Sequence, residues 1–377
     1  MLTLISIKEV NDKKTLNDFV DFIYENYEGD KNFVPPLRSD YIKYVQGVDN
    51  DLNEAGPNIK YICYDDDKVV GRLLVGVNNI INEYHGFKEG YISLFECVEN
   101  YEYAEKLLDK AIEFLKSHGM TKVKGPLSLP GGEDNRGFIV DNFDAQPFIM
   151  NTYNKKYYND FFIKYGFEKY FDCYAYKDTI ENADIERYEK LVPYAMKKFD
   201  FRVDNINLSN VDKDAMDIMN VLERALPREW DDFAPPREEE IRKIVKQLVP
   251  FADSDLIFIA RDNKTNEPIG FNITLPDYNQ AIKKMNGKMF PFGFLKFLYY
   301  KRKINRIRFF VLFVVPEYRK KGVTSVMYLK TYLNALKKGY TELEGSTIWE
   351  YNRDMMNDVE SFGAKINITY RIYQKDI

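Results

Sequence analysis

Apolar strands and helix-like segments alternate along the chain. The apolar runs at 90–97 and 307–315 are each followed by a segment whose apolar residues recur with the helical period. In the first these residues are Leu107, Leu108, Ala111, Phe114 and Leu115, and in the second Val326, Leu329, Leu333 and Leu336. Both segments stop at a glycine, which is a common end of a helix. Because a strand–helix–strand unit of this length forms a right-handed crossover, the pattern predicts parallel strands in each half.

The two halves of the chain repeat three motifs in the same order. NFVPPLRSDYI at 32–42 matches DFAPPREEEI at 232–241, and HGMTKVKG at 118–125 matches KGYTELEG at 338–345. Between these motifs each half has two apolar strands joined by a polar turn, at 61–77 and 257–275. The offset grows from about 200 to about 220 residues, which indicates an insertion near 276–305.

This repetition predicts an α/β fold of two tandem domains, at 1–180 and 181–377. Each domain is expected to have a central mixed β-sheet flanked by helices, because the hairpins add antiparallel strands to the parallel crossovers. A helix at 181–198 is expected to connect the two domains.

The composition narrows the classes of function. Of 377 residues, 45% are hydrophobic and 30% are charged, which is typical of a globular protein. The net charge of −5 argues against nucleic acid as a partner. With only two histidines, a His-ligated metal site or a Ser-His triad is not expected. Three scattered cysteines and no apolar run of membrane-spanning length predict a cytoplasmic protein.

The segment VVPEYRKKGVTSVM at 314–327 has the features of an anion-binding loop. The first N–H groups of a helix are unpaired, and the helix dipole adds positive potential there. Gly322 would let a ligand approach the backbone closely, and the three preceding residues are cations. A basic turn with solvated side chains has the same composition, so the loop alone leaves both interpretations open.

The matching turn of the first half, CVENYEYAEKL at 97–107, serves as an internal control. It has no glycine and no cation before Lys106, and Glu99 and Glu102 would repel an anion. We therefore expect one anion site per chain, in the second half.

The loop resembles the acyl-CoA motif of the GCN5-related N-acetyltransferase (GNAT) superfamily, Val-x-Pro-x-Tyr-Arg-x-Lys/Arg-Gly-Val/Ile-Gly/Ala. Nearly the whole chain resembles bacterial tandem-GNAT proteins, through segments such as FVPPLRSDYIKYV at 33–45, GPLSLPGGEDNRGFIVDNFD at 125–144 and YNKKYYNDFFIKYGFEK at 153–169. The resemblance implies an acyltransferase whose co-substrate is acetyl-CoA or another acyl-CoA.

The resemblance also implies where the cofactor binds. In such folds the long strand splays from its parallel neighbour, and pantetheine pairs with the exposed strand backbone. Those backbone contacts would come from Phe313, Val314 and Val315. The pyrophosphate would be held by Arg319, Lys320, Lys321, Gly322, Val323 and Thr324, and Asn352 matches an asparagine that often faces the cofactor.

The chain departs from the family's pattern at two points. Thr324 stands where Gly or Ala is usual. The tyrosine that often acts as general acid, four residues before a glycine, is replaced by Phe162 in the first half and Val359 in the second. For the general base we select Glu350, because it lies at the carboxyl end of its predicted strand, where ligands bind in such sheets. A surface glutamate is an equal alternative.

Three functions are compatible with these residues. The first is an N-acyltransferase that acts on a small-molecule or peptide amine by direct attack in a ternary complex. The second is a non-catalytic acyl-CoA-binding or regulatory protein, which the missing tyrosine favours. The third is an aminoacyl-tRNA-dependent transferase, which the acidic net charge disfavours.

The segment PFGFLKFLYYKRKINRIR at 291–308 combines aromatic and basic residues with no acidic one. We expect an amphipathic helix packed on the sheet with a solvated basic end. Contact with the cofactor's 3′-phosphate, an acidic partner or a membrane surface are the alternatives.

Overall fold

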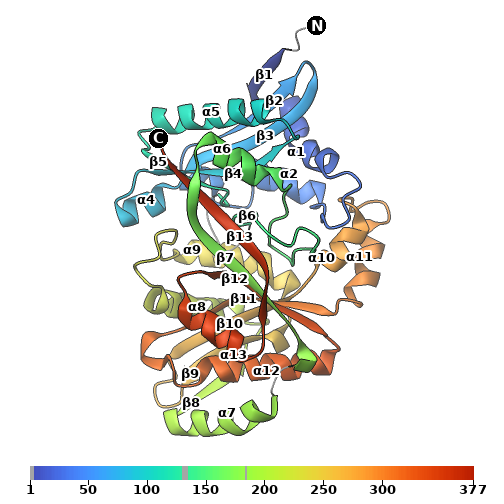
Figure 1. The fold of residues 1–377 in the computed structure, drawn as a ribbon. Coiled ribbons are helices and arrows are strands. Elements are labelled where there is room, and N and C mark those ends of the chain that lie inside the picture. Colours follow the sequence, from blue (N-terminus) through green and yellow to red (C-terminus); the bar gives the residue numbers. More distant parts are fainter. Residues whose placement is uncertain (1–3, 130–134, 183–184) are drawn as a thin grey trace. The chain divides into compact units, whose positions relative to one another are not determined.

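The computed structural model describes residues 4–129, 135–182 and 185–377 (Figure 1). Parts of the segment at 125–144 and of the expected connecting helix lie outside these residues. The chain forms two compact units. Unit 1 consists of Met1–Tyr174, Asn279–Arg302 and Asn367–Ile377, and unit 2 of Ala175–Tyr278 and Lys303–Ile366. Both units therefore draw on both halves of the sequence.

Unit 1 is built on a mixed sheet. Its strands follow the order β1 (Ile5–Glu9), β2 (Asn58–Asp65), β3 (Lys68–Val77), β4 (Glu89–Cys97), β5 (Lys122–Gly125), most of β13 (Lys365–Asp376) and the first part of β7 (Glu168–Thr179), up to Tyr174; β6 (Phe138–Ile139) pairs with β13. Its helices are α1 (Lys13–Asn26), α2 (Arg38–Gln46), α3 (Leu52–Ala55), α4 (Asn79–His85), α5 (Tyr101–Ser117), α6 (Tyr157–Tyr165), α10 (Asn279–Ile282), the 3-10 turn η4 (Lys283–Met285) and α11 (Gly293–Lys301).

Helices cover both faces of the unit 1 sheet, as the alternation of β2 shows. Tyr61 and Cys63 belong to a core shared with α5 and α6, whereas Ile62 and Tyr64 belong to a second core shared with α1 and α2. Successive side chains of a strand point to opposite faces, so a strand that is apolar at every position must be covered on both sides.

Unit 2 repeats this architecture. Its sheet contains Ala175–Thr179 of β7, then β12 (Glu342–Trp349), β11 (Arg306–Val314), β10 (Pro268–Pro276), β9 (Ile257–Asp262) and β8 (Phe201–Asn205). Its helices are η1 (Ile180–Asn182), α7 (Ile185–Phe199), α8 (Val211–Ala225), α9 (Glu238–Leu248), η2 (Val249–Phe251), η3 (Ser254–Leu256), η5 (Pro316–Tyr318), α12 (Val323–Lys338) and α13 (Arg353–Ser361). Helix α12 packs on β8–β11, and α8 packs on β9–β11.

The predicted mixed sheet and its parallel crossovers are confirmed. Strand β4 pairs in parallel with β5, and β11 pairs in parallel with β12, each at its amino-terminal end. The long strands β4 and β11 also share an irregularity, since the register shifts between β3 and β4 and again between β10 and β11. The two units therefore share more than the three sequence motifs.

The insertion at 276–305 belongs mainly to unit 1, although it interrupts the second half of the sequence. The Arg38 N–H donates to the Gly287 carbonyl at 3.1 Å, and Asn279 Nδ2 donates to the Pro147 carbonyl at 3.1 Å. Lys283 Nζ donates to Gln146 Oε1 at 2.8 Å. These contacts with first-half residues explain why the segment belongs to unit 1.

Candidate functional site

The strands β11 and β12 separate partway along their length. Their parallel pairing runs from Arg306–Glu342 to Phe309–Gly345, whereas β11 stays paired with β10 as far as Val314. The Val315 N–H donates to the Ile269 carbonyl at 3.0 Å, so the backbone of residue 315 faces β10. Because backbone direction alternates along a strand, Leu312 and Val314 present their N–H and C=O groups to the opposite side, where β12 has diverged.

A cavity of about 570 Å³ lies at this divergence. Its wall is formed by the end of β11, the loop that follows and the first turn of α12, together with the end of α8 and the first half of α13. The lining residues are Ala225, Pro227, Trp230, Leu312, Phe313, Val314, Arg319, Lys320, Gly322, Thr324, Ser325, Asn352, Asp354, Met355, Asn357 and Asp358.

The loop after β11 exposes a run of backbone N–H groups at the cavity. Lys320 and Gly322 both have left-handed backbone angles, with φ of 61° and 85°. Gly322 precedes the first residue of α12, where no side chain caps the helix. Within the described residues, the N–H groups of Lys320, Gly322, Val323, Thr324 and Ser325 have no acceptor. Such groups at a helix start form an anion site.

Gly322 is required here for two reasons. Its φ of 85° is disfavoured for residues with a Cβ, and an added Cβ would lie 2.9 Å from Cβ of Ala195 in α7. Helix α7 therefore packs closely on the loop at Gly322, where α12 begins.

The three cations of the loop have different roles. Arg319 donates from Nη2 to the Ala225 carbonyl at 2.8 Å and from Nε to the Val314 carbonyl at 3.3 Å, so its guanidinium ties the loop to α8 and β11. Lys321 does not line the cavity, and its Nζ lies 4.6 Å from the centre of the Tyr318 ring. Lys320 lines the cavity.

Two carboxylates share the cavity wall with Lys320. Asp354 and Asp358 lie one turn apart on α13. Loss of hydration raises the pKa of Asp358, the neighbouring Asp354 raises it further, and Lys320 opposes both effects. The cavity therefore carries both signs of charge beside the N–H groups.

The remaining predicted residues lie near the cavity or on it. Asn352 lines it and caps α13, because its Oδ1 accepts from the Met355 N–H at 3.3 Å. Glu350 follows β12, is half-buried and does not line this cavity. Val315 and Val323 are buried and also do not line it. The structure thus brings Phe313, Val314, Arg319, Lys320, Gly322, Thr324 and Asn352 together at one cavity.

Sequence reasoning missed an aromatic cluster beside the cavity. It consists of Trp230, Phe233, Phe313, Trp349 and Tyr351. Trp230 and Phe313 line the cavity, and their ring centroids are 5.9 Å apart. Trp230 also contacts Trp349, and Trp349 contacts Phe233 and Tyr351. Both tryptophans of the chain belong to this cluster. Because they are 119 positions apart in the sequence, the sequence alone does not predict that they are in contact.

A buried glutamate lies where β11 and β12 still pair. Glu344 is opposite Arg308 in the register, and both side chains are fully buried. Ser346 Oγ donates to Glu344 Oε1 at 2.7 Å. Burial raises the pKa of Glu344 to about 7, although the hydrogen bond from Ser346 and the nearby Arg308 oppose the shift. Glu344 does not line the cavity.

Unit 1 differs at the equivalent helix start. Helix α5 is capped by Asn100, whose Oδ1 accepts from the Glu102 N–H at 3.0 Å. Glu102 also places a carboxylate in the first turn. The side chain of Asn100 and the charge of Glu102 therefore occupy the position that is open at α12.

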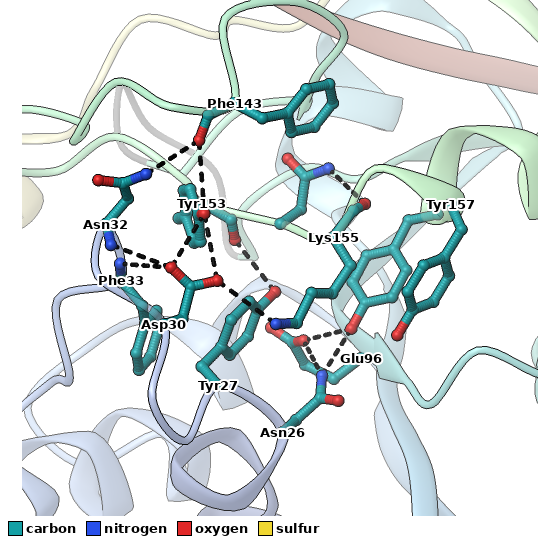
Figure 2. Close-up of polar contacts among 12 residues, drawn as sticks. Asn26, Tyr27, Asp30, Asn32, Phe33, Glu96, Phe143, Tyr153, Lys155 and Tyr157 are labelled. Atoms are coloured by element: carbon teal, nitrogen blue, oxygen red, sulfur yellow. Dashed lines mark hydrogen bonds and ion pairs between the residues drawn. The ribbon is translucent and has the colours of Figure 1, made fainter.

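Carboxylates in unit 1 instead take part in a polar cluster near the end of β4, as Figure 2 shows. Glu96 Oε2 accepts from Tyr158 OH at 2.7 Å and from Asn26 Nδ2 at 3.1 Å. Burial raises the pKa of Glu96, and Arg72 opposes the shift. Close by, Asp30 accepts from Tyr153 OH at 3.1 Å. These contacts connect β4 with α1 and α6, and the loop after α1 with the segment before α6.

No family model matches the chain. It is 27% identical over 380 residues to Protein YghO of Escherichia coli, covering 97% of this chain and 94% of that protein. It is 24% identical over 360 residues to Bacterial ceramide synthase of Caulobacter vibrioides, covering 92% of this chain and 91% of that protein.

The similar solved structures share the fold. A tandem GNAT protein from the clavulanic acid biosynthesis pathway matches with a TM-score of 0.59 at 11% identity, covering 99% of this chain and 98% of that one. The glucosamine N-acetyltransferase region of a fungal multi-domain β-N-acetylglucosaminidase matches with a TM-score of 0.60 at 14% identity, covering 100% of this chain and 38% of that one. The chain therefore has the tandem GNAT fold, as its loop motif predicts.

Among the described residues, no helix is long and apolar enough to cross a membrane.

Proposed function

We propose that this chain is an acyl-CoA-dependent N-acyltransferase that binds its acyl-CoA in the unit 2 cavity. The observation that carries the proposal is the meeting of two backbone features at one cavity. The edge of β11 that β12 has left, at Leu312 and at the Val314 N–H, lies at the same place as the N–H groups of Lys320 and of Gly322 to Ser325. A strand edge suits the amides of pantetheine, and a helix start suits a pyrophosphate.

Different residues bind different parts of the acyl-CoA. The backbone of Leu312 and the Val314 N–H pair with pantetheine. Val315 does not take part, because its N–H is bonded to Ile269 on the other side of β11. The N–H groups of Gly322, Val323, Thr324 and Ser325 hold the pyrophosphate, and Lys320 adds charge. Arg319 acts indirectly, because its two hydrogen bonds fix the loop.

The reaction is a direct transfer. A neutral primary amine attacks the thioester carbonyl carbon, a C–N bond forms, and the C–S bond breaks to release the CoA thiolate. The amine nitrogen loses one proton to a base, and the thiolate takes one proton from an acid or from water. Glu350 is the proposed base, acting through water, since it follows the strand that diverges from β11.

The aromatic cluster supports an acyl chain longer than acetyl. Trp230 and Phe313 place apolar surface on the cavity wall, and the whole segment from Phe309 to Phe313 is only half-buried. Apolar side chains in a central strand are usually covered, so a ligand with apolar groups would complete their burial. The similarity to a protein named bacterial ceramide synthase points the same way, because ceramide carries a fatty acyl chain on nitrogen.

A non-catalytic acyl-CoA-binding protein is the second candidate. Val359 and Phe162 stand where the family often has a tyrosine that acts as general acid, and both are buried. The two candidates agree on the cofactor site and differ in turnover. Release of free CoA thiol from acetyl-CoA and palmitoyl-CoA, measured over a panel of amines that includes long-chain amino alcohols, separates them.

The binding site is tested with a matched pair of variants. Thr324→Asp puts a carboxylate among the N–H groups, and Thr324→Asn is its neutral counterpart of similar size. We expect Thr324→Asp to weaken acyl-CoA binding at least about tenfold by calorimetry, because like charges would meet at the cavity. The same carboxylate stabilises the start of a helix, so the melting temperature should not fall. Unchanged affinity in Thr324→Asp would exclude the cavity as the pyrophosphate site.

A further inference from the structure

Helix α11 presents an exposed apolar surface. Six large apolar side chains within ten residues are exposed: Phe290 (80%), Phe292 (66%), Phe294 (49%), Leu295 (61%), Leu298 (45%) and Tyr299 (57%). The expectation that this segment packs its apolar face on the sheet is wrong. In α11 the half-buried positions are Phe297 and Tyr300, and Gly293 is buried.

The exposed residues form one stripe. At 100° per residue, Phe294, Leu298, Leu295 and Tyr299 span about 140° of the helix, and Phe297 and Tyr300 lie on the opposite side. Phe290 and Phe292, just before the helix, are exposed as well. A contiguous apolar surface of this kind marks an interaction site rather than ordinary scatter of single residues.

The segment that carries this stripe is strongly basic. Residues 279–303 contain Lys283, Lys284, Lys288, Lys296, Lys301, Arg302 and Lys303 and no acidic residue, although the chain as a whole has a net charge of −5. Lys284, Lys288, Lys296, Lys301 and Arg302 are exposed. The positive charge is therefore concentrated on the element that exposes the apolar stripe.

We propose that α11 and the residues before it dock this protein on an anionic lipid bilayer surface. Aromatic and leucine side chains of an amphipathic helix enter the boundary between headgroups and acyl chains, while flanking Lys and Arg contact anionic headgroups. A second copy of the chain fits less well, because a symmetric contact through this face would bring the cations of both copies together. The proposal rests on unit 1 alone and does not depend on the acyltransferase reaction.

The test is flotation of the full chain with two kinds of vesicle, phosphatidylcholine alone and phosphatidylcholine with phosphatidylglycerol. We expect the chain to float with the anionic vesicles and the bound fraction to fall as salt is raised. The variant Phe292→Ser/Leu295→Ser/Leu298→Ser should lower vesicle partition at least about tenfold. The variant Lys288→Glu/Lys296→Glu should remove the preference for anionic vesicles.

The matched control is Ile163→Ser/Leu191→Ser/Ile366→Ser, which changes three exposed apolar residues elsewhere, at 55%, 50% and 47% exposure. It should bind vesicles as the unchanged chain does. The proposal is overturned if the unchanged chain binds neither vesicle, or if the α11 serine variant binds as well as the control. A further outcome is that the unchanged chain binds no vesicle but dimerises in sedimentation equilibrium, and that only the serine variant abolishes the dimer. The stripe would then be a contact with a second copy of the chain. If only the charge variant loses binding, the contact is purely electrostatic and the apolar stripe takes no part in it. This result would also overturn the proposal.

Discussion

The rings of Trp230 and Trp349 are in contact, with centroids 4.8 Å apart and planes inclined by 39°. Trp230 lines the cavity of unit 2, whereas Trp349 is 3% exposed at the end of β12. Because the chain has only these two tryptophans, its whole indole fluorescence comes from this pair. The pair thus reports on the place where β11 and β12 diverge.

Binding of an acyl-CoA should change the tryptophan emission. A long acyl chain would displace water from Trp230 and shift the emission to shorter wavelength, more than acetyl-CoA does. A fluorescence titration measures this, and Thr324→Asp at the same ligand concentrations is the control. If calorimetry shows saturation and the emission does not change, the acyl group does not bind next to the tryptophan pair.

Trp230→Leu should affect long acyl-CoAs selectively. The substitution removes aromatic surface from the cavity wall but leaves the N–H groups of Lys320 and of Gly322 to Ser325 in place. We expect the affinity for palmitoyl-CoA to fall about tenfold, and the affinity for CoA itself to stay within about twofold, since only the former buries the apolar chain. Phe233→Leu, in the same cluster but off the cavity, is the matched control. Equal losses for both ligands would argue against an acyl subsite here.

Arg319→Ala should mainly lower stability, whereas Lys320→Ala should mainly weaken acyl-CoA binding. Arg319 holds two backbone carbonyls, so its loss should lower the free energy of unfolding by about 1–2 kcal/mol. Lys320 makes no hydrogen bond among the described residues, so its replacement should leave stability nearly unchanged and weaken acyl-CoA binding several-fold. Urea denaturation and calorimetry on both variants give the two quantities. A destabilised Lys320→Ala with normal affinity would reverse the assigned roles.

The helix caps Asn100 and Asn352 test whether there is one cofactor site. Each caps a helix through its side-chain oxygen, at α5 and α13. Replacing either by Ala should lower stability by about 1 kcal/mol. Only Asn352 lines the unit 2 cavity, so only Asn352→Ala should also weaken acyl-CoA binding. Weaker binding in Asn100→Ala would indicate a second site in unit 1.

Glu344 should make stability depend on pH. Burial raises its pKa from 4.5 to about 7 in the folded chain. Between these values the folded state holds a proton that the unfolded state has lost, so stability is full below about pH 4.5 and declines as pH rises through 7. The expected loss is about 3 kcal/mol, since each pKa unit corresponds to about 1.4 kcal/mol.

The control for this prediction is Glu344→Gln, which cannot titrate. Urea denaturation at several pH values should show the decline between pH 5 and 8 in the unchanged chain and a flatter profile in the variant. Only the slopes are compared, because glutamine also changes the contact with Arg308. Identical slopes would remove Glu344 as the source.

Local patterns were enough to predict the elements that form the site. The strand expected at 307–315 is observed as β11 at Arg306–Val314, and the helix that stops at Gly339 is α12. Apolar periodicity determines such elements because it depends on neighbours a few residues apart. The glycine at 322 was informative for the same reason, since the backbone angle that it adopts is a local property.

Other features depended on hydrogen bonds between distant segments. Whether Val315 or Leu312 faces the diverging strand is set by the bond from the Val315 N–H to Ile269. The use of Arg319 as a tie is set by the position of Ala225. Neither partner can be identified from the spacing of residues within the loop.

The sequence by itself determined the repeated mixed architecture, the helix start that exposes N–H groups and the absence of a matching loop in the first half. Only the tertiary structure decided that 279–302 and 367–377 join unit 1, that Trp230 reaches the cavity and that the stripe of α11 remains exposed. The division has a physical reason. Periodicity and backbone preference act over a few residues, whereas burial and strand pairing depend on which distant segment supplies the covering surface.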